Sequence, residues 1–128
     1  MVSRDTSVQV AAVVVATTLA VLSAQFGSPT AGTPLLLGAA SYIVVFAGSH
    51  IYLALRGDSE SVPVAARWRF AALVVTAVGA MVVGVTYRNV SVAGTGLGTV
   101  LGLGVAALFA GYWLYEAWDG YQASRRGA

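Results

Sequence analysis

Four long apolar runs separated by short polar segments make up most of the chain. They cover residues 8–26, 34–55, 70–87 and 93–118, and the stretch from Thr6 to Leu55 contains no Asp, Glu, Lys or Arg. A helix rises about 1.5 Å per residue, so roughly 20 apolar residues cross the ~30 Å hydrocarbon core of a bilayer. The pattern therefore predicts a single transmembrane domain with four spanning helices over residues 1–128.

The composition indicates the same class. Hydrophobic residues make up 58% of the chain and charged residues 9%, whereas soluble domains average about 25% charged residues. We therefore expect an integral membrane protein in contact with the lipid bilayer. All seven basic residues are Arg, a bias that indicates a high-GC prokaryotic genome. The net charge of +2 is small and divided between termini and loops, so no nucleic-acid partner is expected.

Several kinds of chemistry are excluded by the residue types. The chain has no cysteine and one histidine, which rules out disulfides, thiolate metal sites, cysteine nucleophiles and bis-histidine haem ligation. No nucleophile, histidine and acid occur in a catalytic order, and no acidic cluster suits a metal. We therefore expect a protein that is not an enzyme and that binds neither a metal nor a cofactor.

The first apolar run has an alternative interpretation as a signal peptide. Arg4 would form its basic region and Leu22-Ser23-Ala24 its cleavage site. The run is longer than the usual apolar region of roughly 7–15 residues. It also has a counterpart in the third run, since residues 10–15 resemble residues 70–75. We expect the segment to be retained as the first span.

The second half of the chain resembles the first. Residues 46–57 read FAGSHIYLALRG and residues 109–120 read FAGYWLYEAWDG, with six identities in twelve positions. Two spans per copy make both copies enter the membrane from the same side, related by a pseudo-twofold axis along the membrane normal. The sequence predicts an all-α, integral membrane four-helix bundle made of two tandem hairpins, residues 8–57 and 70–120, in a parallel 2+2 duplication.

Small residues recur every four positions at the start of the last run. A helix carries such residues on one face, where another helix can approach backbone to backbone. We predict that this glycine zipper is a packing surface. The alternative, in a chain this rich in alanine, is chance spacing combined with general packing. The members of the row are Gly94, Gly98, Gly102, Ala106 and Ala110.

The arginines are unevenly distributed between the two sides of a four-span arrangement. One side carries six of them and the other carries Arg88 alone, so the positive-inside rule places both termini in the cytoplasm of a multi-pass cell-membrane protein. Aromatic residues gather at the same boundary, as expected for an interfacial belt. The six are Arg4, Arg56, Arg67, Arg69, Arg125 and Arg126.

One candidate site lies near this boundary. His50 is the only histidine and lies about 9 Å inside the end of the second span by the helical rise. An ionisable side chain at that depth is a functional candidate, although a neutral, hydrogen-bonded structural imidazole is the alternative. Glu116 is the carboxylate expected nearest to it, and an acidic neighbour favours the protonated imidazole of a proton-linked switch.

The candidate binding cluster collects the polar and aromatic residues that differ between the two copies. The alternative is a girdle that only fixes the helices at the interface. The cluster consists of His50, Tyr52, Arg56, Tyr112, Tyr115, Glu116 and Asp119.

Two functions follow as hypotheses. The first is a small membrane protein that acts through helix packing and assembly, as a homo-oligomer or as an accessory subunit of a membrane complex. The alternative is a small transporter or channel for an ion or small solute, with the His50 and Glu116 cluster as its binding or proton-linked site. A membrane enzyme or cofactor carrier that uses the same cluster is a third and less favoured reading.

Overall fold

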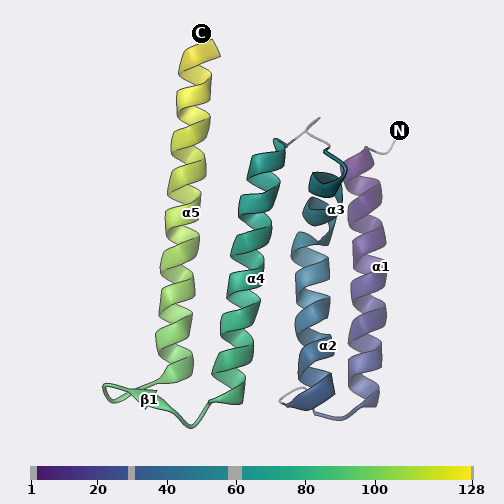
Figure 1. The fold of residues 1–128 in the computed structure, drawn as a ribbon, viewed down its shortest axis with the longest axis vertical. Coiled ribbons are helices and arrows are strands. Elements are labelled where there is room, and N and C mark those ends of the chain that lie inside the picture. Colours follow the sequence, from purple (N-terminus) through teal and green to yellow (C-terminus); the bar gives the residue numbers. More distant parts are fainter. Residues whose placement is uncertain (1–2, 29–30, 58–61, 128) are drawn as a thin grey trace.

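Helices account for most of the structure, a computed structural model that describes residues 3–28, 31–57 and 62–127. Figure 1 shows the long helical segments side by side. They are α1 (Arg4–Gln25), a second segment over Gly32–Leu55, α4 (Val64–Thr86) and α5 (Leu97–Gly127). All four are long and apolar enough to cross a membrane. This confirms the prediction of an all-α chain with four candidate spans.

The start of the last helix differs from the predicted span at residues 93–118. A small antiparallel hairpin, β1 (Ser91–Val92) and β2 (Thr95–Gly96), precedes α5. Its turn residues Ala93 and Gly94 both have positive φ, 50° and 82°, as the central residues of a type I′ turn require. At its other end α5 continues past residue 118, because no proline follows to stop it. Where each helix meets the bilayer surface stays a prediction.

The second segment is interrupted by a π-turn. It consists of α2 (Gly32–Ile43), the π-turn η1 (Val44–Gly48) and α3 (Ser49–Leu55). A π-turn holds more residues per turn than an α-helix, so the residues after it face a different direction from those of an unbroken helix. The sequence predicted one continuous span at residues 34–55. The π-turn therefore sets which side chains of α3 point toward α1.

Three hydrogen bonds join α1 to the second segment. At one end Gln9 Nε2 donates to the carbonyl oxygen of Val45 in η1 at 2.9 Å, and Ser49 Oγ donates to Gln9 Oε1 at 2.7 Å. At the other end Ser23 Oγ donates to the carbonyl oxygen of Pro34 at 2.7 Å. Hydrogen bonds between helices contribute about 0.6–2 kcal/mol each within a membrane. These bonds join α1 to the second segment near both of its ends, at α2 on one side and at η1 and α3 on the other.

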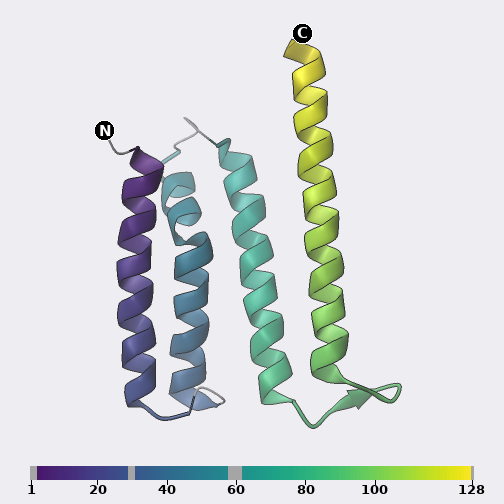
Figure 2. The ribbon, with the colours of Figure 1, turned by 180° about the vertical axis from the view of Figure 1, so that it is seen from behind.

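The helices form an open row rather than a closed bundle, as the two opposite views show (Figures 1 and 2). The second segment lies between α1 and α4, and the buried core lies where it meets α4. Within the described residues, α5 contacts α4 and the hairpin but no other helix. The core residues are Ala39, Ala47, Ala71, Val74 and Val78. The second segment and α4 therefore share the core, while α1 packs on the second segment and α5 on α4.

A bundle closed by a twofold axis would require an additional contact. In such a bundle, a twofold rotation exchanges α1 with α4 and the second segment with α5. The contact between the second segment and α4 would then have an equivalent contact between α5 and α1. These two helices do not meet in the described part of the chain. Because only one face of α5 has a protein neighbour, none of its residues is buried. The tandem duplication stays a prediction from the sequence.

Candidate functional site

A buried arginine joins three helices at the end of the row that holds the N-terminus. Arg67 lies in the first turn of α4, and its side chain is the only charged one with 0% exposure among the described residues. Its Nη2 donates to Asp5 Oδ1 on α1 at 3.0 Å, and its Nη1 lies 3.2 Å from His50 Nδ1 on α3. We call Asp5, His50 and Arg67 the Arg67 network.

The network defines the state of the histidine. A guanidinium only donates hydrogen bonds, so the Nδ1 atom of His50 accepts one from Arg67 and the neutral ring carries its proton on Nε2. The ring also packs edge-on against Phe70, with centroids 4.9 Å apart. Protonation at Nδ1 would replace this hydrogen bond with two adjacent cations. The structure therefore holds His50 in one tautomer and orientation.

A polar groove opens beside the network, between α1 and α3. Its volume is about 350 Å³, within the range of small-ligand sites. Arg67 does not line the groove. It contacts Asp5 and His50 from behind the lining, so its positive charge acts on the groove without direct contact with a solute. The residues that line the groove are Asp5, Thr6, Gln9, Val10, Ser49 and His50. The arrangement offers hydroxyl, amide, imidazole and carboxylate groups to a small polar solute.

A second ionic contact ties α5 to α4. Arg69 Nε donates to Glu116 Oε1 at 2.8 Å, and its Nη2 donates to Glu116 Oε2 at 3.4 Å, a two-point pairing. The Arg69 guanidinium also lies over the ring of Tyr115, 5.1 Å from its centroid. Both ionic side chains are partly exposed, at 34% and 26%. This contact fastens the second half of α5 to the start of α4.

The predicted cluster is therefore divided into separate groups. Glu116, expected nearest to His50, pairs with Arg69 instead, and Asp5 is the carboxylate that shares Arg67 with His50. Residues two apart on a helix point about 200° apart. Arg67 consequently faces α1 and α3 while Arg69 faces α5, and α4 separates the two ionic groups.

Aromatic rings connect the two groups, and the other members of the predicted cluster lie outside them. Phe70 lies between His50 and Tyr112, with ring centroids 4.9 Å and 6.2 Å away. Arg56, which follows the end of α3, donates from Nη1 to the hydroxyl of Tyr52 on α3 at 3.2 Å. Asp119 is exposed on α5. The structure therefore does not bring all seven residues together in a single site.

The most buried member of the site was missed by reasoning from the sequence. Arg67 was counted only as a topology signal, because its partners Asp5 and His50 are 62 and 17 positions away in the chain. One signal was available. Asp5 and Arg67 both stand at the same-side boundary of an apolar run in the four-span arrangement, and opposite charges at one depth in a membrane tend to pair.

The small-residue row lies mostly outside the contact between α4 and α5. Gly94 is in the hairpin turn rather than in a helix. Gly98 is near Gly84, where a Cβ placed on Gly84 would lie 3.6 Å from the Cα of Gly98. Beside the row, partly buried side chains of α5 lie one position before its members, at Leu97, Leu101, Val105 and Phe109. Whether the row packs against another molecule stays a prediction.

These observations define the class of the protein but not a family. The chain has four candidate membrane-spanning helices, which indicates a multi-pass membrane protein. Among the described residues, no three His, Asp or Glu side chains come together as a metal site requires. Comparison with protein-family models, curated proteins and solved structures gives no match.

Proposed function

We propose that this protein acts through helix packing and assembly, as a homo-oligomer or as an accessory subunit of a membrane complex. The observation that carries the proposal is the isolation of α5. It is the longest helix, yet none of its 31 residues is buried. Its only helical neighbour in the described chain is α4, so most of its surface is available to another protein.

The exposed small residues identify the face that another helix would use. Lipid tails are as apolar as leucine, so helices in a membrane associate through close packing at small residues rather than through a hydrophobic drive. A step of four residues turns a helix about 40° past a full turn. The partly buried Val105 and Phe109, which face α4, drift in the same way, so Ala106 and Ala110 stay exposed about 100° from the contact with α4. These two alanines are the proposed centre of the interface.

Cross-linking at position 106 tests this interface. A photo-activated side chain placed at Ala106 is expected to give an adduct at twice the 13.1 kDa chain mass in native membranes, because a helix packed on the row lies within contact distance. The matched control is Ala107, which is also exposed and has the same depth but points about 100° away.

The two positions should differ clearly. Ala106→Leu should also lower the oligomer fraction seen by light scattering in mild detergent, while Ala107→Leu leaves it unchanged. No protein adduct at position 106, or equal adducts at both positions, would remove the row as the interface.

The proposed orientation places both termini in the cytoplasm of a prokaryotic cell. It rests on the six arginines at one end of the row of helices against Arg88 at the other. Reporter fusions after Ala128 and within residues 28–33 should be active in the cytoplasm and in the exterior respectively. Activity of both fusions on the same side would contradict the four-span topology.

A second candidate function is a small transporter, favoured by the polar groove beside the Arg67 network. The groove offers a carboxylate, an amide and an imidazole close to the end of three spans. His50 remains the candidate proton-linked group, now with Asp5 and Arg67 as its ionic neighbours in place of Glu116. Proton or solute flux into liposomes separates this function from assembly.

A further inference from the structure

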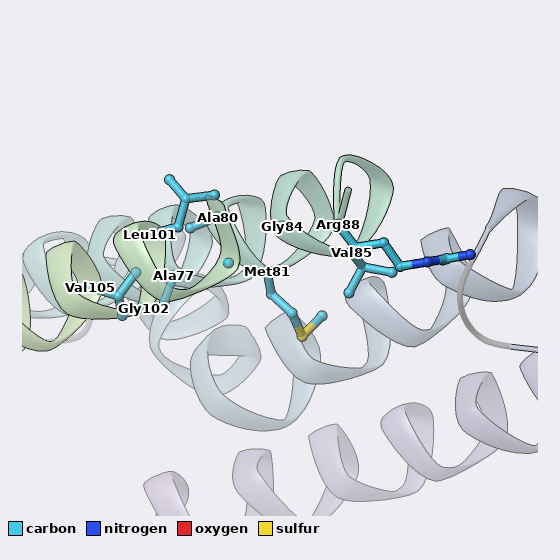
Figure 3. Close-up of a pocket in the computed structure, with 10 residues that line it drawn as sticks. Ala77, Ala80, Met81, Gly84, Val85, Arg88, Leu101, Gly102 and Val105 are labelled. Carbon is cyan, nitrogen blue, oxygen red and sulfur yellow. The ribbon is translucent and has the colours of Figure 1, made fainter. Parts of the chain in front are cut away.

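We propose that the protein binds an anionic phospholipid, with one acyl chain in a groove between α4 and α5 and the headgroup phosphate at Arg88. The groove has a volume of about 540 Å³. Figure 3 shows the lining side chains, which are apolar or absent except for Arg88. They are Ala77, Ala80, Met81, Gly84, Val85, Arg88, Gly98, Leu101, Gly102 and Val105.

The groove has the length of one membrane leaflet. It runs along α4 from Ala77 to Arg88, which is about 16 Å at the helical rise of about 1.5 Å per residue. Half of the ~30 Å hydrocarbon core is about 15 Å. A chain that enters beside Arg88 therefore reaches the middle of the membrane within the groove. A protein helix is wider than an acyl chain and would not reach the floor formed by Gly84 and Gly98.

Arg88 supplies the charge that selects the headgroup. It follows α4 at the hairpin end of the row and forms no hydrogen bond or ion pair within the described residues. In Figure 3 its side chain extends along the groove, away from Ala77 and Met81. Arginine binds phosphate through two parallel N–H donors. An unpaired guanidinium at the polar end of an apolar groove is complementary to a phosphate that carries an acyl chain.

The position of Arg88 also makes the site specific to one end of the molecule. It is the only arginine at the hairpin end, whereas the six others lie at the opposite end or in the C-terminal tail. Ala106 and Ala110, the centre of the proposed interface, do not line the groove. Gly98 and Gly102 belong to both the groove and the small-residue row, so the lipid site adjoins the centre of the proposed interface without including it.

The test compares phosphatidylglycerol with phosphatidylcholine by native mass spectrometry of the purified, detergent-solubilised protein. The same spectra report bound lipid and oligomeric state. Arg88→Gln should weaken the tightest phosphatidylglycerol binding about fivefold, the effect of one basic residue at a membrane surface. Binding of phosphatidylcholine should not change. Arg88→Lys should keep most of the preference, and Arg125→Gln, at the other end, should leave the tightest binding unchanged.

A second variant tests the acyl chain. A Cβ at Gly102 meets no atom within 4 Å, so Gly102→Leu fills the groove without a clash and should reduce binding of both lipids. Inorganic phosphate should not displace the lipid. Equal phosphatidylglycerol affinity of the wild type and Arg88→Gln, or displacement by inorganic phosphate, would overturn the proposal. Unchanged lipid binding by a folded Gly102→Leu protein would overturn it as well.

Discussion

Arg67→Met should be the most destabilising single substitution in the Arg67 network, lowering the free energy of unfolding by about 3 kcal/mol. Removing one partner of a buried ion pair costs about 3–5 kcal/mol, because the remaining charge loses its partner while it stays out of water. The lower value applies here because the Asp5 side chain is 36% exposed and regains some solvation. Unfolding in mild detergent by stepwise addition of a denaturing detergent measures the change.

Arg69→Met is the matched control for that substitution. Arg69 is two residues away on α4 and also pairs with a carboxylate, but its side chain is 34% exposed. Exposed ion pairs contribute about 0–1 kcal/mol, so this loss should be at least threefold smaller than that of Arg67→Met. Equal losses from the two substitutions would show that burial of Arg67 does not decide the stability of the chain.

Gly84→Leu should separate α5 from α4 and lower the melting temperature. A Cβ on Gly84 already touches α5, 3.6 Å from the Cα of Gly98 and 3.8 Å from Leu101 Cδ1, so the larger leucine side chain would press against the α5 backbone. Overpacking of this kind costs about 1–3 kcal/mol. A thermal melt of the purified protein in detergent, followed by helical circular dichroism, gives the measurement.

Gly79→Leu provides the comparison on the same helix. A Cβ on Gly79 meets no atom within 4 Å, and leucine is favoured over glycine in a helix by up to about 0.8 kcal/mol. This variant should melt at or above the wild-type temperature. If Gly84→Leu and Gly79→Leu melt together, the contact between α4 and α5 does not depend on the small residue at position 84.

The spans were predictable from the sequence because a span is defined by the summed hydropathy of some twenty residues. Every residue contributes to that sum, so no single residue or contact decides it. The π-turn at Val44–Gly48 was not, since the segment carries no proline to mark a break and its contact with Gln9 comes from a residue 36 positions away on α1. The hairpin before α5 had a local signal in Ala93-Gly94, which was read as the start of the small-residue row. The turn formed by Ala93 and Gly94 therefore excludes Gly94 from the helix, although its spacing of four residues from Gly98 fits a helical row.

The candidate site was only partly predictable for a related reason. Position along a span sets the level of a residue in the row of helices, and His50 and Glu116 do lie level with arginines of α4, Arg67 and Arg69 respectively. Which of them pair depends on rotation about each helix axis, and the 200° between Arg67 and Arg69 assigns them to different neighbours. Depth alone cannot distinguish the partner of His50 from that of Arg69.

The length of α5 gives the molecule a mechanical property. Its 31 residues extend about 46 Å at the helical rise, and Figure 1 shows its C-terminal end projecting beyond the other helices. The helix can be regarded as a lever whose pivot is the close approach of α5 to α4 at Gly98 and Gly84. The ion pair Arg69–Glu116 lies between this pivot and the free C-terminal end. A sideways force on the C-terminal end would therefore strain this ion pair first, whereas the core, which contains no residue of α5, would not be loaded directly.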